Sequence, residues 1–351
     1  MAALGVTAAT DMANAALLWY VRGKTLSQTT QDKPLLKWLR SGQKTYGGGN
    51  ALQISEPVQF AFLSDTPGTL QGFSGDDSLT FNTMSNIQRA VFTGKEVVQN
   101  FWITWTDLLQ DQISIYDDRK GGRKVDHSDA AVTRLTGILE NRLDDFGESW
   151  SRNFNLMLWQ DGSQDAKQVP GVQALLNDTP ATGTVGGLNK ATYAGWRQRV
   201  TLGLAPSAEN STLIQFFNSE LVQLKRYGGK PNKWVAGSAF LDAIRLELFA
   251  KGYFTMEGFQ GSKATDLGMG GIHISGIGKC EYDPTLDNIA FSKRSYIFDG
   301  RRIKLRPIEG EDNKILMPER PYNYLVFLHS MKWAGALTIT QLNANGVYSV
   351  A

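Results

Sequence analysis

Few of the residues that do chemistry in enzymes occur in this sequence. It has one cysteine, Cys280, and three histidines, His127, His273 and His329, among 351 residues. A lone cysteine excludes a disulfide within the chain, and histidines so far apart lack the spacing of a zinc site. We therefore expect Cys280 to be a small buried apolar residue and each histidine to be a surface residue or a hydrogen-bonded core residue.

The sequence motifs of common enzyme classes are missing as well. No GxSxG elbow and no GxxxxGK[ST] phosphate loop occurs. The glycine-rich stretch 268–278 begins like a dinucleotide-binding loop, but His273 and Glu281 stand where the third glycine should be. The sequence therefore predicts a protein that is not an enzyme, with no catalytic residues, no cofactor and no metal site.

Long apolar runs and an excess of one charge are also absent. No run approaches the roughly 18 residues that span a bilayer. Asp11 and Asn14 interrupt the apolar opening, which no basic stretch precedes, so we expect no signal peptide and folding in a reducing cytoplasm. With 36 basic and 34 acidic residues, the chain carries little of the charge that grips DNA. If the protein occurs beside nucleic acid, we expect it to enclose the nucleic acid without binding it tightly.

Alternating apolar residues predict β-strands from Leu52 to Phe62, from Ile87 to Phe92 and from Val97 to Trp105. The first two strands flank a polar, glycine-rich stretch, residues 64–78. This arrangement predicts a long two-stranded hairpin with a mobile tip. A lone ribbon is only marginally stable in water, so we expect the hairpin to lie on a neighbouring subunit.

A long amphipathic helix follows. Eight apolar residues recur with a mean period near 3.6: Val132, Leu135, Leu139, Leu143, Phe146, Trp150, Phe154 and Met157. They predict a helix over 129–160, about 48 Å long, that begins at Ser128 and ends at Asp161-Gly162. A helix of this length with an apolar stripe must lie along an equally long partner.

The rest of the chain has shorter elements. The first fifty residues combine a polar stretch with a glycine-rich one and read as an extended arm. A basic turn is either a solvated hairpin end or a weak contact with nucleic acid or another acidic partner; its residues are Arg119, Lys120, Arg123 and Lys124. Apolar patterning predicts helices over 211–227 and 240–250, and strands over 234–236, 272–277, 289–292, 303–305, 322–333 and 336–342.

Four stretches resemble one family. They are LMLWQDG (156–162), TPATGTVGGLNKATYAGWR (179–197), FFNSELVQLKRYGGKPNKWVAG (216–237) and MKWAGALTITQLN (331–343). Together they resemble the major capsid proteins of tailed phages with the Hong Kong 97-like shell fold. The resemblance runs from about Gly137 to the C-terminus, and the first hundred residues match in pattern only.

The resemblance implies an α+β fold with named parts. These are an N-terminal arm (1–50), an extended β-hairpin called the E-loop (51–95), a peripheral domain with a spine helix (96–165, helix 129–160), an axial domain (166–315) and closing strands of the peripheral domain (316–351). It also implies that tip residues of the E-loop contact a neighbouring subunit. The tip residues in question are Asp65, Pro67, Gly68, Gly72, Gly75, Asp76 and Asp77.

The resemblance further implies a function without catalysis. Copies would assemble into hexamers and pentamers that close an icosahedral shell around a double-stranded DNA genome. Assembly would take place in the host cytoplasm, the finished protein would belong to the virion, and no membrane would be involved. Expected partners are a scaffolding protein, a portal and, as a further candidate, a decoration or cement protein. The alternative is an encapsulin-like shell that encloses protein cargo.

Two departures from some family members sharpen these expectations. Some members form a covalent crosslink through a lysine of the E-loop, but no lysine occurs here between Asn50 and Gly94. We therefore expect a non-covalent shell in which Asp65, Asp76 and Asp77 contact basic neighbours. Some members also begin with a long scaffolding segment that is cleaved off. Fewer than fifty residues precede the hairpin here, so we expect a separate scaffolding protein and an uncleaved chain.

Overall fold

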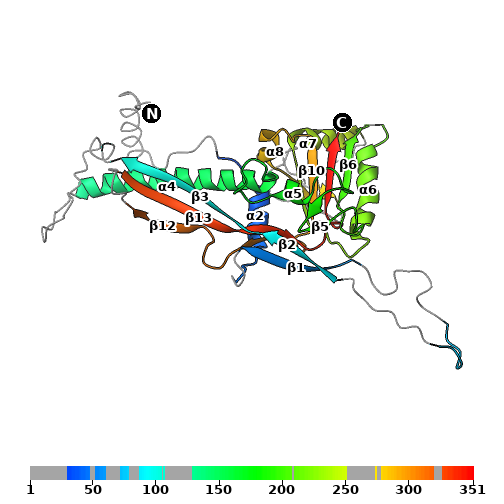
Figure 1. Cartoon of the computed structure of the whole chain (residues 1–351). Coiled ribbons are helices and arrows are strands. Elements are labelled where there is room, and N and C mark those ends of the chain that lie inside the picture. Colours follow the sequence, from blue (N-terminus) through cyan, green and yellow to red (C-terminus); the bar gives the residue numbers. More distant parts are fainter. Residues whose placement is uncertain are drawn as a thin grey trace, which may run out of the picture. The chain divides into compact units, whose positions relative to one another are not determined.

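The computed structural model describes residues 30–47, 52–60, 72–78, 87–104, 106, 129–207, 209–250, 273–274, 278–319 and 326–351. Contacts divide the chain into two compact units. Unit 1 contains residues 98–153 and 313–333 with the N-terminal residues to Gln31, and unit 2 contains residues 32–97, 154–312 and 334–351. Figure 1 labels the elements, of which helix α4 (Asp129–Trp159) and strand β13 (Val326–Ile339) contribute residues to both units.

Unit 2 is built on a six-stranded sheet with the order β6-β14-β10-β7-β9-β8. The strands are β6 (Arg199–Leu204), β14 (Gly346–Val350), β10 (Arg294–Phe298), β7 (Lys233–Ala236), β9 (Gly278–Tyr282) and β8 (His273–Ile274). The central strands pair antiparallel, while β6 runs parallel to β14 and β9 parallel to β7. All four residues of β7 are buried, as a strand covered on both faces requires.

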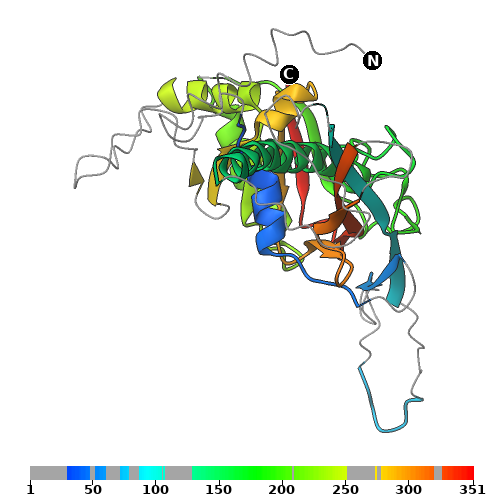
Figure 2. The ribbon, with the colours of Figure 1, turned by 90° about the vertical axis from the view of Figure 1, so that its left-hand side faces the viewer.

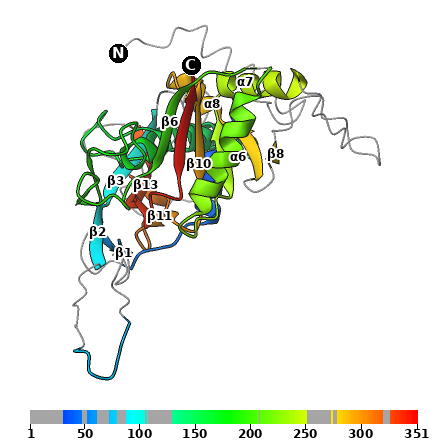
Figure 3. The same cartoon turned by 90° about the vertical axis from the view of Figure 1, so that its right-hand side faces the viewer.

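Two helices pack beside this sheet. Helix α6 (Thr212–Lys225) places Leu213, Phe217 and Leu224 at helical spacing, and all three are buried in one cluster with Phe240 of α7 (Ser238–Ala250). Figure 3 shows α6 next to the strands of the sheet. The predicted helices 211–227 and 240–250 are therefore present, and Cys280 lies in the same core, as predicted.

A buried carboxylate joins the two helices. Ser211 precedes α6 without capping it through its side chain. The first N–H groups of the helix are satisfied instead by Glu247 of α7, which accepts from Leu213 at 3.0 Å and from Ile214 at 3.3 Å. Glu247 is fully buried. A helix N-terminus favours a negative charge, so α7 supplies the cap that α6 lacks.

A second buried polar cluster holds helix α2 (Pro34–Ser41) in unit 2 (Figure 2, where α2 is blue). The side chain of Asn155 accepts the Leu36 N–H at 3.2 Å and donates to Thr285 Oγ1 at 2.7 Å. Asp283 accepts the Trp159 indole N–H at 2.8 Å and caps α8 (Pro284–Asn288). The expectation that the first fifty residues are extended is wrong for residues 34–41, which form α2 and bury Pro34, Leu35, Leu36 and Leu39.

The base of the predicted hairpin is present in unit 2. Strands β1 (Gln53–Gln59) and β2 (Ile87–Thr93) pair antiparallel, with Ile54 opposite Phe92. Two short strands, β4 (Thr184–Val185) and β5 (Leu188–Asn189), form a tight turn, and α5 (Val172–Leu175) is a single helical turn. Strand β11 (Ile303–Pro307) pairs with the C-terminal part of β13.

Unit 1 combines the main part of α4 with strands β3 (Lys95–Thr104), β12 (Lys314–Glu319) and β13. Strands β12 and β3 both pair with β13. The rings of Phe101, Phe146 and His329 pack together with centroids 5.0 to 5.8 Å apart. Gln99 of β3 donates to the Ser149 hydroxyl at 2.8 Å. One face of this sheet is therefore covered by the helix.

The long helix agrees with its prediction to within one residue at its end. Burial is confirmed for four residues of the predicted stripe: Phe146, Trp150, Phe154 and Met157. The prediction is wrong for Leu143, whose side chain is 41% exposed. The stripe is thus narrower at that turn than the sequence indicates. Ser128 and the side chains of Val132, Leu135 and Leu139 lie outside the described residues.

Four of the predicted strands need correction. Residues 289–292 are not a strand, because α8 ends in a turn there and the strand is β10. Residues 322–333 and 336–342 are not two strands, because β13 continues unbroken through Gly335, which pairs with Pro307. Of 272–277, the described part forms only the two-residue strand β8.

Within the described residues, no helix has the length and apolar character needed to cross a membrane.

Candidate subunit-contact surfaces

The β1–β2 ribbon rests on the segment 183–198, which we call the ribbon seat. Phe60, just after β1, stacks on Tyr193 with ring centroids 4.4 Å apart and meets the edge of Trp196 at 5.9 Å. The Val91 N–H donates to the Gly186 carbonyl at 2.8 Å. Aromatic pairs at these distances stabilise by about 0.5–1.5 kcal/mol beyond the apolar area that they bury, so the ribbon base is firmly held.

The seat has its shape because of a glycine turn. Gly186 and Gly187 both have positive φ, 58° and 77°, and join β4 to β5. Such a two-residue turn favours glycine at both positions. A Cβ on Gly186 would lie 2.9 Å from the Ala90 Cβ and 3.1 Å from the Phe92 ring. The close approach of β2 therefore also requires glycine here.

A buried lysine fixes the seat from beneath. Lys190 is fully buried, and its ammonium donates to Asn177 Oδ1 and Gln198 Oε1, each at 2.8 Å. Neither partner is charged, and burial lowers the pKa of Lys190 to about 8. Gln198 also donates to the Asn177 carbonyl at 2.5 Å. The cation thus links the middle of the ribbon seat to its last residue, Gln198, and to Asn177, which precedes the seat.

The two faces of the ribbon differ. Ile54, Val58, Ala90 and Phe92 are buried, whereas the opposite face exposes Pro57, Ile87, Arg89 and Val91. Side chains alternate across a strand, and the register places Pro57 opposite Arg89. Exposed large apolar residues gathered on one face mark a contact surface. We call this set the ribbon outer face.

The described part of the tip is one tight turn. Ser74 N–H donates to Asp77 Oδ2 at 2.9 Å, and Asp77 N–H donates back to the Ser74 carbonyl at 2.9 Å. Asp76 lies exposed in the same turn, and Phe73 beside it is 64% exposed. The sequence reading missed Phe73, although an aromatic residue in a polar glycine-rich stretch signals a contact. Gly72 and Gly75 are described and exposed, while Asp65, Pro67 and Gly68 lie outside the described residues.

Unit 1 has an exposed sheet face, which we call the open face. Residues of β3 alternate, so Gln99 and Phe101 face α4 while Val98 and Trp102 do not. Trp102 is 58% exposed, and Leu316 of β12, opposite Ser330 of β13, is exposed too. Next to Ser330, β13 carries Lys332. The open face therefore combines apolar area with a basic side chain.

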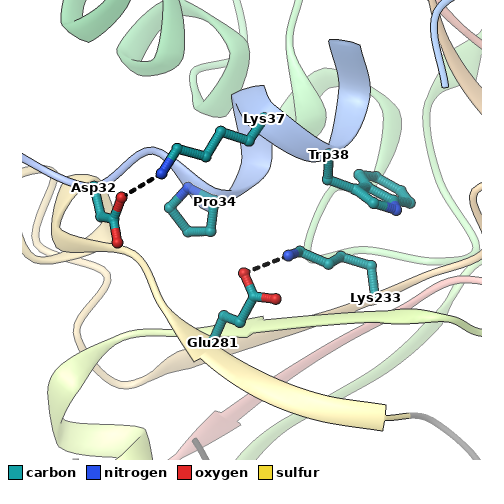
Figure 4. Close-up of a pocket in the computed structure, with 6 residues that line it drawn as sticks. All are labelled: Asp32, Pro34, Lys37, Trp38, Lys233 and Glu281. Carbon is teal, nitrogen blue, oxygen red and sulfur yellow. Dashed lines mark hydrogen bonds and ion pairs between the residues drawn. The ribbon is translucent and has the colours of Figure 1, made fainter. Parts of the chain in front are cut away.

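A pocket of about 350 Å³ lies in unit 2 (Figure 4). Two ion pairs line the pocket: Lys37 with Asp32 at 2.6 Å, and Lys233 with Glu281. The Trp38 side chain lines it as well. Each cation is thus matched by its own carboxylate. The described residues hold no group of three or more potential metal ligands. The basic residues Arg119, Lys120, Arg123 and Lys124 lie outside the described residues.

Comparison with known proteins defines the fold. No protein-family model and no curated protein matches the sequence. The chain is similar to the Cyanophage A-1(L) capsid asymmetric unit, with a TM-score of 0.62 and 16% identity, covering 93% of this chain and 95% of that chain. A capsid chain of Cyanophage P-SCSP1u matches with a TM-score of 0.53 and 13% identity, covering 94% of this chain and 91% of that chain. The capsid of a native GTA particle matches with a TM-score of 0.55 and 13% identity, covering 97% of this chain and 98% of that chain.

The chain therefore has the α+β fold of phage capsid proteins along almost its whole length. The sequence resemblance is confirmed at the level of this fold. The domain boundaries, and the contact roles of the tip and the basic turn, stay predictions.

Proposed function

We propose that this chain is the major capsid protein of a tailed phage, a structural protein rather than an enzyme. The observation that carries the proposal is the match to capsid chains over more than nine-tenths of this chain and of theirs. Copies would assemble into hexamers and pentamers that close an icosahedral shell around double-stranded DNA. An encapsulin-like shell is not favoured, because the matching structures named above are capsids of two cyanophages and of a GTA particle.

Self-assembly would use the exposed surfaces described above. The ribbon would reach a neighbouring subunit and lay its outer face, Ile87 and Val91, against that subunit. In the tip, Phe73 would supply an apolar anchor, while Asp76 and Asp77 would meet basic groups. The open face of a neighbour, with Trp102 and nearby Lys332, offers both kinds of partner. Burying one large apolar side chain contributes about 1.5–3 kcal/mol, so a few such contacts per subunit stabilise a shell.

The remaining partners follow from the same proposal. A separate scaffolding protein would guide assembly in the host cytoplasm, a portal would occupy one vertex, and a decoration or cement protein would bind the outside. The subunits would be held together without covalent crosslinks, because no lysine occurs between Asn50 and Gly94. Boiled and reduced particles should then run as a single monomer band on a denaturing gel, and a ladder of bands would contradict this.

Expression of the chain with its neighbouring genes, followed by negative-stain electron microscopy, tests the proposal. Icosahedral particles that hold nuclease-protected DNA are the expected result. Particles that hold protein cargo and no DNA would favour the encapsulin alternative. A chain that stays a soluble monomer under all conditions would sink the capsid proposal.

A further inference from the structure

We infer that two adjoining turns of unit 2, residues 225–230 and 299–302, contact the phosphate backbone of the enclosed DNA. We call them the basic turn pair. The inference rests on the proposed function, since it needs DNA inside the shell. The basic residues of the pair are Lys225, Arg226, Lys230, Arg301 and Arg302.

A buried carboxylate holds the two turns together. Asp299 is fully buried and accepts the Lys230 N–H at 2.8 Å, the Arg301 N–H at 3.0 Å and Arg301 Nη2 at 2.9 Å. The same Arg301 nitrogen donates to the Gly228 carbonyl at 3.0 Å. Burial alone would raise the pKa of Asp299, but these hydrogen bonds outweigh it and hold the pKa below its ordinary value. The turns are thus a fixed surface, built around a permanent negative charge.

The charge on this surface is one-sided. Of the five basic side chains, Arg301 pairs with the carboxylate of Asp299. Among the described residues the other four form no ion pair, so four positive charges remain on the basic turn pair, although the whole chain carries only +2. Lys225, Arg226 and Lys230 are exposed. Clustered lysines and arginines are what phosphate contacts require, and they bind without reading base sequence.

An exposed aromatic ring adds to the surface. Tyr227 is 61% exposed, and the Arg226 guanidinium lies 5.5 Å from the centre of its ring. This contact holds an otherwise mobile arginine close to the surface. The competing occupant is the acidic tip of another copy, whose described turn carries only Asp76 and Asp77. The four cations that have no ion-pair partner among the described residues exceed these two carboxylates, whereas a DNA backbone offers a continuous row of charge.

Photocrosslinking in assembled particles tests the inference. We would make Tyr227→p-benzoylphenylalanine in the full chain, form DNA-filled particles and irradiate them. The matched control is Val222→p-benzoylphenylalanine, because Val222 lies in the last turns of α6, which ends at Lys225 just before Tyr227, and is 66% exposed. We expect a protein–DNA adduct from position 227 in filled particles, none in empty ones, and a several-fold lower yield from position 222. An adduct with residues 72–78 of another copy, or filled particles without a DNA adduct, would overturn the inference.

A solution measurement gives the number of phosphates. The affinity of the unassembled full-length chain for a short DNA duplex is measured at several salt concentrations. In the double variant Lys225→Gln with Lys230→Gln, log affinity should fall less steeply with log salt, and the magnitude of the slope should be smaller by about 2. The control pair is Lys167→Gln with Lys293→Gln, two exposed lysines elsewhere in unit 2. An equal loss in both pairs would overturn the inference by showing a diffuse charge effect. In the crosslinking experiment, wild-type protein that forms no particles would count against the proposed function, and filled particles without the contact would count against this inference alone.

Discussion

Replacement of Lys190 tests how the ribbon seat is held. In the unfolded chain its ammonium has an ordinary pKa of 10.5, whereas burial in the folded chain lowers the pKa to about 8. Between these values the unfolded state binds one more proton than the folded state, so the free energy of unfolding rises with pH. The span of about 2.5 pH units, at about 1.36 kcal/mol each, corresponds to about 3 kcal/mol.

The measurement compares urea unfolding of the wild-type chain with that of Lys190→Met between about pH 7.5 and 10.5. Other groups also titrate, since burial raises the pKa of the Cys280 thiol and that of Tyr348. They titrate equally in both chains, so the difference between the chains isolates the lysine. From the low end of this pH range to the high end, the free energy of unfolding of the wild-type chain should rise by roughly 3 kcal/mol relative to that of Lys190→Met.

A matched control is Lys167→Met, which removes an exposed lysine of the same unit and should leave the pH dependence of the wild-type chain unchanged. If the difference between wild type and Lys190→Met stayed constant with pH, the account of Lys190 as a buried cation with neutral partners would be refuted.

Three further changes address the ribbon, its tip and the basic turn pair. Gly186→Val should push β2 off the seat, since even a Cβ there meets Ala90; we expect native far-UV circular dichroism but a loss of particles in sedimentation, and normal particles would contradict the close-approach argument. Phe73→Ser should leave unfolding of the single chain within about 0.5 kcal/mol of wild type while lowering particle yield, and an unchanged yield would remove Phe73 from the contact. Asp299→Asn should cost about 1–3 kcal/mol at neutral pH in urea unfolding. Because the pKa of Asp299 is held low, that loss should shrink as the pH falls through the folded-state pKa, and a loss independent of pH would refute its role as a charged anchor.

Elements with strong periodicity could be predicted from the sequence. The stripe that ends in Phe146, Trp150, Phe154 and Met157 places α4 almost to the residue, because a long amphipathic helix repeats one signal many times. The ribbon base was also predictable, since apolar and polar residues alternate in β1 and β2. Tertiary contacts were not, and neither the ribbon seat nor the Lys190 cluster has a pattern of its own.

The errors have local causes. Helix α2 was overlooked because its neighbours are polar and glycine-rich, although Pro34 at its start and Gly42 after its end are the usual boundary signals. The segment 289–292 looked apolar enough for a strand, but Asp283 and Pro284 begin a helix just before it. The two predicted strands 322–333 and 336–342 left residues 334–335 unassigned, yet β13 runs through both of these residues.

The cap that Glu247 provides has a consequence for shell geometry. Pulling α7 away from α6 would strand a buried carboxylate and the helix N–H groups that it satisfies, and leaving such groups unpaired is costly. The two helices must therefore move as one rigid block. In the proposed shell, rings of five and of six copies would demand slightly different subunit shapes, and that adjustment would have to come from the ribbon or other parts of the chain outside this block.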